Sequence, residues 1–116
     1  MSEKGILSDL KRCTRKSEPY DSSWEREYML LLDGDPFVVR WERCRSLRIP
    51  YVKASGKPGH FNPDFIVERT DGTKELHEVK GTHLLDSEDT QRKIKAGTEF
   101  AYARGMVFKV ITKPER

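Results

Sequence analysis

The chain has 116 residues, which is the length of one compact domain and enough to bury a single core without a structural metal or disulfide. Charged and hydrophobic residues each make up 35%, and the mean hydropathy is −0.76, so the composition disfavours a membrane span and an apolar secreted scaffold. The 22 basic and 19 acidic residues give a net charge of +3, which excludes a histone-like polycation.

The two cysteines, Cys13 and Cys44, form no CxxC pair and have no histidine at zinc-ligand spacing. This pattern disfavours a zinc module and is typical of a reducing compartment. The first residues contain no apolar run of seven or more, so no signal peptide is predicted. We therefore expect a cytoplasmic protein.

Residues 1–19 are rich in lysine and arginine and contain few residues that could pack. They form either a basic arm, which would order on a partner or in a dimer, or a loose solvated terminus. The main domain is expected over 20–116. It begins with an amphipathic helix over 22–32, which ends where Gly34 supplies a left-handed stop and Pro36 prevents continuation.

The remaining elements alternate between strands and one further helix. Strands are predicted over 37–41, 63–68 and 75–80, with a short extended piece at 49–52, a flexible basic loop at 53–60 and a turn at Asp71-Gly72. A second helix over 89–104, capped by Ser87 or Asp89, ends at Gly105. The apolar strand 106–111 is expected to be buried on both faces. The order αβββαβ predicts an α/β fold, with helices around a small mixed sheet.

The spacing within the stretch 62–81 predicts a catalytic site. On a strand, Glu78 and Lys80 project to one side and Val79 to the other. If Asp64 lies alongside, two carboxylates and the Val79 carbonyl make an all-oxygen site that suits Mg²⁺ or Mn²⁺. Lys80 would then orient the attacking water or take its proton. Taken alone, Asp64 could cap a turn, and Glu78 and Lys80 could form a surface ion pair.

Strand register tests this hypothesis. A two-residue turn at Asp71-Gly72 would put Asp64 opposite Val79, on the wrong side of the sheet. A three-residue loop over 71–73 would put Asp64 opposite Lys80 and restore a common side. We therefore predict a three-residue loop or a bulge in this hairpin.

The first helix offers a third acid. Glu25 lies on the boundary of the apolar face, whereas Glu27 falls on the solvated side, so Glu25 is the better candidate. The aromatic residues Trp24, Tyr28, Trp41 and Phe65 lie on amphipathic or buried stretches and are expected in the core.

The segments Ser22-Ser23-Trp24-Glu25, Asn62-Pro63-Asp64-Phe65 and Glu78-Val79-Lys80-Gly81 together resemble the PD-(D/E)XK restriction-endonuclease-like superfamily. The chain is most similar to the N-terminal domain of TnsA-type transposon endonuclease subunits and to phage endonuclease I-type Holliday junction resolvases. The resemblance implies that Asp64 and Glu78 bind metal, that Lys80 is the catalytic lysine, and that Glu25 binds or orients a second metal.

The resemblance implies a Mg²⁺-dependent endodeoxyribonuclease, with Mn²⁺ as a substitute, acting as a structure-selective, resolvase-like enzyme of a phage or mobile element. A phage-encoded protein would act in the host cytoplasm. Two alternatives stay open: a non-catalytic DNA-binding or assembly subunit, and the nuclease subunit of a transposition complex. A single site per chain predicts a homodimer if both DNA strands are cut, and a partner protein could supply targeting.

Basic residues flank the predicted site in the sequence and could follow a DNA backbone, although a solvated charged face is the alternative. The predicted DNA-binding residues are Arg43, Arg45, Lys53, Lys57, His83, Arg92 and Lys93. His60 also flanks the site, and His77 is expected to be packed or solvated on the strand side opposite Glu78.

Overall fold

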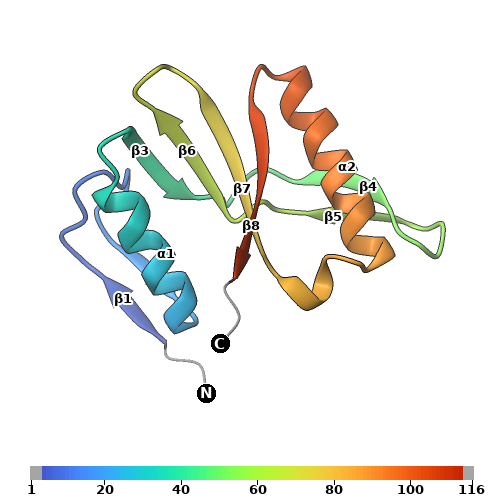
Figure 1. Cartoon of the computed structure of the whole chain (residues 1–116), viewed down its shortest axis with the longest axis horizontal. Helices are drawn as coiled ribbons and strands as arrows, with labels where there is room; N and C mark the ends of the chain where they lie inside the picture. Colours follow the sequence, from blue (N-terminus) through green and yellow to red (C-terminus); the bar gives the residue numbers. More distant parts are fainter. Residues whose placement is uncertain (1–3, 114–116) are drawn as a thin grey trace.

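A four-stranded mixed sheet forms the centre of the computed structural model, which describes residues 4–113 apart from the side chains of Thr82 and Lys113. The strand order is β3-β6-β7-β8 (Figure 1). The strands are β3 (Val38–Arg43), β6 (Phe65–Arg69), β7 (Lys74–Gly81) and β8 (Val107–Lys113). β6 pairs antiparallel with β3 and β7, whereas β8 runs parallel to β7. Parallel neighbours need a crossover connection, and α2 (Glu88–Ala103) lies within it.

The two α-helices cover opposite faces of the sheet. α1 (Ser23–Gly34) buries Tyr28, Met29 and Leu32 in a cluster that includes Phe65 and Val67 of β6. Ile66, between them, packs in a second cluster with residues of α2, because strand side chains alternate between faces. We call these the α1 face and the α2 face. Within residues 4–113, neither helix has the length and apolar character needed to cross a bilayer.

The predicted αβββαβ order is confirmed, and so is the α/β class. Ser87 caps α2, because its side chain accepts a hydrogen bond from the Thr90 N–H at 3.3 Å. Gly105, at φ 71°, follows the end of α2 as predicted.

The predicted end of the first helix and the predicted burial of the last strand are wrong. Gly34 is not left-handed; α1 ends with the Asp35 N–H donating to the Leu32 carbonyl at 3.3 Å. β8 is not buried on both faces, because it is the last strand of the sheet in the described structure, and Val107 and Lys109 are exposed.

A separate hairpin packs against α2. Its strands are β4 (Ile49–Val52) and β5 (Pro58–Phe61), and Ile49 and Phe61 join the α2-face cluster. The loop predicted over 53–60 is therefore shorter, since 58–60 belong to β5. The turn of this hairpin extends beyond α2 (Figure 1).

The β6–β7 hairpin has the predicted three-residue loop, displaced by one position to 70–72. Glu68 pairs with Lys74, and the Arg69 N–H donates to the Thr73 carbonyl at 2.8 Å. Gly72 closes the turn at φ 89°, a backbone conformation that glycine adopts without steric cost. The displacement moves the register by two residues, so Ile66 faces Leu76 and not Glu78 as predicted. An even shift preserves which side chains share a face.

The N-terminal segment packs against the sheet. β1 (Gly5–Leu7) pairs with β2 (Glu18–Tyr20), and between them Leu10 and Cys13 are buried in the α1-face cluster. Cys13 also forms a parallel bridge with Trp41, which covers the outer edge of β3. From residue 4 onward the segment predicted as a basic arm thus contributes to the core, and residues 1–3 lie outside the described part.

A buried polar network links α1 to three strands. The Glu75 carboxylate contacts His77 at 2.8 Å, Arg69 at 3.1 Å and Lys109 at 3.0 Å, and His77 Nδ1 lies 2.5 Å from the Tyr28 hydroxyl. Burial opposes ionisation of Glu75, but these three contacts outweigh it and lower the pKa of Glu75 to about 2. Burial lowers the pKa of His77 and favours the neutral ring. His77 is therefore packed, the first of its two predicted alternatives.

The lowered pKa of Glu75 predicts a pH-dependent contribution to stability. The ionised carboxylate stabilises the fold above its ordinary pKa of 4.5, and this contribution disappears as the pH falls toward 2. We expect Glu75→Gln to lower the free energy of unfolding by roughly 3 kcal/mol at pH 7, and by much less near pH 2.5. Urea unfolding over this pH range measures the difference. Glu68→Gln, which breaks an exposed pair with Arg40, should cost less than about 1 kcal/mol. A cost for Glu75→Gln that does not change with pH would contradict the assignment.

Candidate active site

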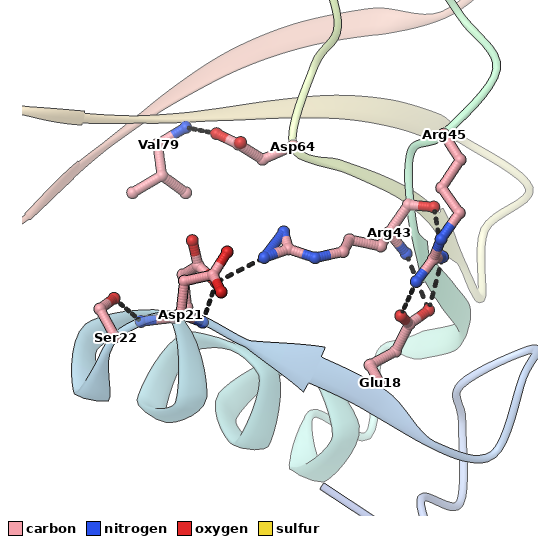
Figure 2. Close-up of polar contacts among 8 residues, drawn as sticks. Glu18, Asp21, Ser22, Arg43, Arg45, Asp64 and Val79 are labelled. Atoms are coloured by element: carbon pink, nitrogen blue, oxygen red, sulfur yellow. Dashed lines mark hydrogen bonds and ion pairs between the residues drawn. The ribbon is translucent and has the colours of Figure 1, made fainter. Parts of the chain in front are cut away.

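Asp64 lies where three segments of the chain meet. Its N–H donates to the His77 carbonyl at 2.8 Å, and its own carbonyl accepts from the Cys44 N–H at 2.9 Å. One carboxylate oxygen, Oδ2, accepts from the Val79 N–H at 2.6 Å (Figure 2). Burial raises the pKa of Asp64, although the bond from Val79 and the charge of Arg43 oppose the increase. Asp64 is therefore fixed by the backbone of β7 and does not point freely into solvent.

Glu78 and Lys80 lie next to each other on β7, as their spacing predicts. Lys80 Nζ is 3.2 Å from Glu78 Oε2, and the Glu78 side chain is only 8% exposed. The other carboxylate oxygen, Oε1, is buried without a hydrogen-bond partner in the described structure. Burial raises the pKa of Glu78 to about 7, the charge of Asp64 adds to this, and Lys80 and Lys93 oppose it. Glu78 is thus a buried acid with incomplete polar contacts.

Strand alternation divides the predicted acids between the two faces of the sheet. Val79 packs with the α1-face cluster, so Glu78 and Lys80 project toward the α2 face. Asp64, at the entry to β6, is close enough to influence the charge of Glu78 on one side and to be influenced by Glu25 on the other. The predicted set therefore surrounds one end of the β6–β7 pair and does not occupy a single face.

Glu25 lies in the first turn of α1 and is partly buried. Its Oε1 accepts from the Asp21 N–H at 3.0 Å and forms an ion pair with Arg43, and its own N–H donates to the Ser22 hydroxyl at 3.2 Å. These contacts cap the helix. They are a structural role for Glu25 alongside the predicted metal-binding one.

A pocket of about 180 Å³ lies between the start of α1 and the sheet. The Trp24 indole N–H, which is buried without a partner in the described structure, belongs to a side chain of this pocket. The lining residues are Ser22, Trp24, Glu25, Arg43, Asp64, Phe65, Val79 and Gly81.

No three acidic, histidine or cysteine side chains converge tightly enough to hold a metal ion within the described part of the chain. The donor chemistry nevertheless fits a hard divalent cation. Asp64 and Glu78 are oxygen donors, the charge of Asp64 helps to raise the pKa of Glu78, and Glu78 Oε1 has no partner in the described residues. A cation between them would supply the missing partner. The Val79 carbonyl lies between Glu78 and Lys80 in the chain, and its role as a ligand stays a prediction.

The predicted DNA-binding residues are not gathered into one patch. Lys53 and Lys57 are exposed in the turn of the β4–β5 hairpin, and His83 is exposed in the short 3-10 helix η1 (Thr82–Leu84). Arg92 pairs with Glu88 at 2.9 Å on α2. Lys93 lies over the rings of Tyr51 and Phe61, with Nζ 5.5 Å and 5.9 Å from the ring centroids. His60 is exposed on β5.

Arg43 and Arg45 each contact an acid of the N-terminal part of the chain. Arg43 extends from β3 toward the start of α1, and Arg45 reaches Glu18 (Figure 2). Glu18 is wholly buried on β2, and it also accepts from the Arg43 N–H. Sequence reasoning did not foresee either pair, because their members are 18 and 27 residues apart with no shared motif. Nothing in the sequence around Glu18 or Glu25 indicates an arginine partner.

The raised pKa of Glu78 gives a test of its surroundings. Because the folded pKa of about 7 exceeds the ordinary 4.5, the fold loses stability as the pH rises from about 4.5 to 7. In EDTA, Glu78→Gln should therefore increase the free energy of unfolding at pH 8 by up to roughly 3 kcal/mol, and so raise the melting temperature. At pH 4.5 the substitution should change the melting temperature little. Differential scanning calorimetry measures this. The exposed Glu99→Gln is the control. Destabilisation by Glu78→Gln at pH 8 would show that the carboxylate is satisfied as it stands.

A comparison of the sequence with protein families finds a matching family. The family model described as TnsA-like endonuclease N terminal matches residues 35–113, which include Arg43, Asp64, Glu78 and Lys80 but not Glu25. A comparison with curated proteins found no match. The matched range covers most of the chain and all four strands of the central sheet. The chain belongs to the TnsA-like endonuclease N-terminal family, a restriction-endonuclease-like group.

Proposed function

We propose that the chain is a divalent-metal-dependent endodeoxyribonuclease that hydrolyses DNA phosphodiester bonds. The observation that supports this most directly is the pair of buried carboxylates, Asp64 and Glu78, beside Lys80 at one end of the β6–β7 pair. Family membership supports a nuclease-like activity at a coarse level. Metal dependence and the kind of DNA are part of this proposal and rest on the chemistry of these residues.

Asp64 and Glu78, with the Val79 carbonyl, would hold Mg²⁺, and Mn²⁺ would substitute for it. When bound, the cation supplies charge neutralisation at the phosphate and a lowered pKa for water at neutral pH. Asp64 is positioned for this task by the Val79 N–H, which leaves its second oxygen available. Glu25, across the pocket, would bind or orient a second cation.

Lys80 would orient the attacking water or, as the neutral amine, accept its proton. Its Nζ lies 3.2 Å from Glu78 and its side chain is 18% exposed, so it is held at the boundary between the buried acid and solvent. A lysine in this place also adds a positive charge beside the incoming phosphate, which favours DNA over a neutral substrate.

Exposed cations outside the pocket would hold the DNA backbone: Lys53 and Lys57 in the turn of the β4–β5 hairpin, and Arg92 on α2, against which β4 packs. The half-buried Lys93, which lies over the ring of Tyr51 on β4, would add to them. We favour a structure-selective, resolvase-like enzyme. A second copy would cut the second strand, and a partner protein could supply targeting, as in a transposition complex.

Cleavage assays test the proposed reaction. Supercoiled, linear and four-way-junction DNA are incubated with the protein and Mg²⁺, and we expect the wild type to cut at least one of them. Lys80→Ala should reduce the rate by about 100-fold or more. Lys74→Ala is a matched control, because Lys74 is an exposed lysine at the other end of the same strand. Binding without cleavage of any substrate would favour the non-catalytic alternative.

Metal binding is tested without DNA. A cation that binds only the folded state raises the melting temperature, and the increase grows with the logarithm of its concentration above the Kd. Saturating Mg²⁺ should therefore stabilise the wild type, and Asp64→Asn should abolish most of that increase. Asp71→Asn, in the hairpin turn, is the control for removing an exposed acid. An equal Mg²⁺ effect in both variants would place the cation elsewhere.

A further inference from the structure

Arg43 occupies the centre of the candidate site. It is the last residue of β3, and its side chain crosses toward the start of α1 (Figure 2). Its guanidinium pairs with Glu25, and the two side chains are only 19% and 28% exposed. The guanidinium carbon also lies 5.7 Å from the centre of the Phe65 ring, and its charge favours ionisation of Asp64. The Arg43 guanidinium thus interacts with both Glu25 and Asp64.

A second cation at Glu25, as proposed above, would need the place beside this carboxylate that the guanidinium occupies. The absence of a converging group of three acidic, histidine or cysteine side chains in residues 4–113 agrees with Glu25 being held by Arg43. Two positive charges cannot share a small, partly buried space without repulsion. Metal binding at Glu25 and the Glu25–Arg43 pair therefore exclude each other.

The neighbouring Arg45 forms an ion pair with Glu18 that, by contrast, is permanent. Its partner Glu18 is fully buried, and this acid also contacts the Arg43 N–H and the Cys13 thiol. The Glu25–Arg43 pair differs because it lines the pocket and both members remain partly exposed. Glu25 also keeps its bond from the Asp21 N–H when Arg43 leaves. Only the Arg43 pair can open without leaving a buried charge alone.

We propose that Arg43 is a positioning residue that neutralises Glu25 while the metal is absent and exchanges partners when a divalent cation binds, so that its guanidinium becomes available to a DNA phosphate. The inference rests on the proposed function, since it needs a cation among these acids. Arg43 would then impose an order of binding: the metal binds first, and phosphate binding at this residue follows.

The first measurement uses the wild type and Mg²⁺ alone. Arginine Nε–Hε signals in ¹⁵N-edited NMR spectra report on each guanidinium, and the Arg43 signal is identified by its loss in Arg43→Gln. We expect Mg²⁺ to shift or broaden the Arg43 signal and to leave that of Arg45 unchanged. Binding of Mg²⁺ without any change at Arg43, or no Mg²⁺ binding at all, would overturn the proposal.

The second measurement compares affinities by titration calorimetry. Arg43→Gln removes the competing charge, so the Kd for Mg²⁺ should decrease by about threefold or more, while affinity for DNA in Ca²⁺ should fall. Arg40→Gln is matched in charge and lies three residues earlier on the same strand, paired with Glu68, and it should change the Kd for Mg²⁺ by less than about twofold. An Arg43→Gln protein that binds Mg²⁺ with unchanged or weaker affinity would contradict the exchange.

These outcomes are separate from those of the cleavage assay. If no DNA is cut but Mg²⁺ displaces Arg43, the exchange stands and the proposed reaction fails. If DNA is cut and Arg43 keeps its contact with Glu25 in Mg²⁺, the reaction stands and the exchange fails. Circular dichroism checks that Arg43→Gln is folded, and Arg43→Lys, which keeps the charge and removes the guanidinium, identifies the Arg43 signal if it is not.

Discussion

The pairing of β6 with β7 determines where the polar groups of the site lie. Its three-residue loop sets the register, and the Val79 N–H then fixes the Asp64 carboxylate at the end of the ladder. A register shift by one residue would turn Glu78 and Lys80 to the α1 face and put Val79 among the charges. The backbone therefore holds the acids close together despite their mutual repulsion, and the stability of the hairpin compensates for that repulsion.

Charge at this end of the sheet is balanced within the protein itself. Arginines and lysines from three separate segments face the acids: Arg43 and Arg45 at and just after the end of β3, Lys80 on β7 and Lys93 on α2. Each partly offsets the cost of burying a carboxylate. The offset is incomplete at Glu78, where burial dominates and one oxygen has no partner in the described residues. A net charge of only +3 is consistent with a site in which acids and bases are paired locally.

Local signals in the sequence were sufficient for the main elements of the fold. The helix cap at Ser87, the stop at Gly105 and the apolar periodicity of α1 depend on neighbours within a few residues, and all are present in the structure. The parity of the β6–β7 register was also predictable, because only an odd loop length puts Asp64 and Glu78 in phase. The pairing itself was off by two positions, since loop chemistry does not define where a turn begins.

Contacts between distant segments could not be predicted. The Glu25–Arg43 and Glu18–Arg45 pairs, the burial of Cys13 against Trp41 and the Glu75 network all depend on how complete elements pack together. The position of β8 at the sheet edge is likewise a property of topology, because an apolar strand has the same sequence pattern in the centre and at the edge. For the candidate site, the proximity of Asp64, Glu78 and Lys80 was predictable, whereas the division of these residues between two faces was not.

The ion pair between Glu18 and Arg45 bears on where the folding unit begins. The stretch of recognisable family similarity starts at residue 35, yet the acids that neutralise Arg43 and Arg45 lie before it, on α1 and β2. A protein cut at the boundary of similarity would keep both arginines, lose both carboxylates and expose the sheet face that α1 covers. The unit that folds is therefore longer than the unit that sequence comparison recognises, and residues 18–34 contribute to the architecture of the candidate site.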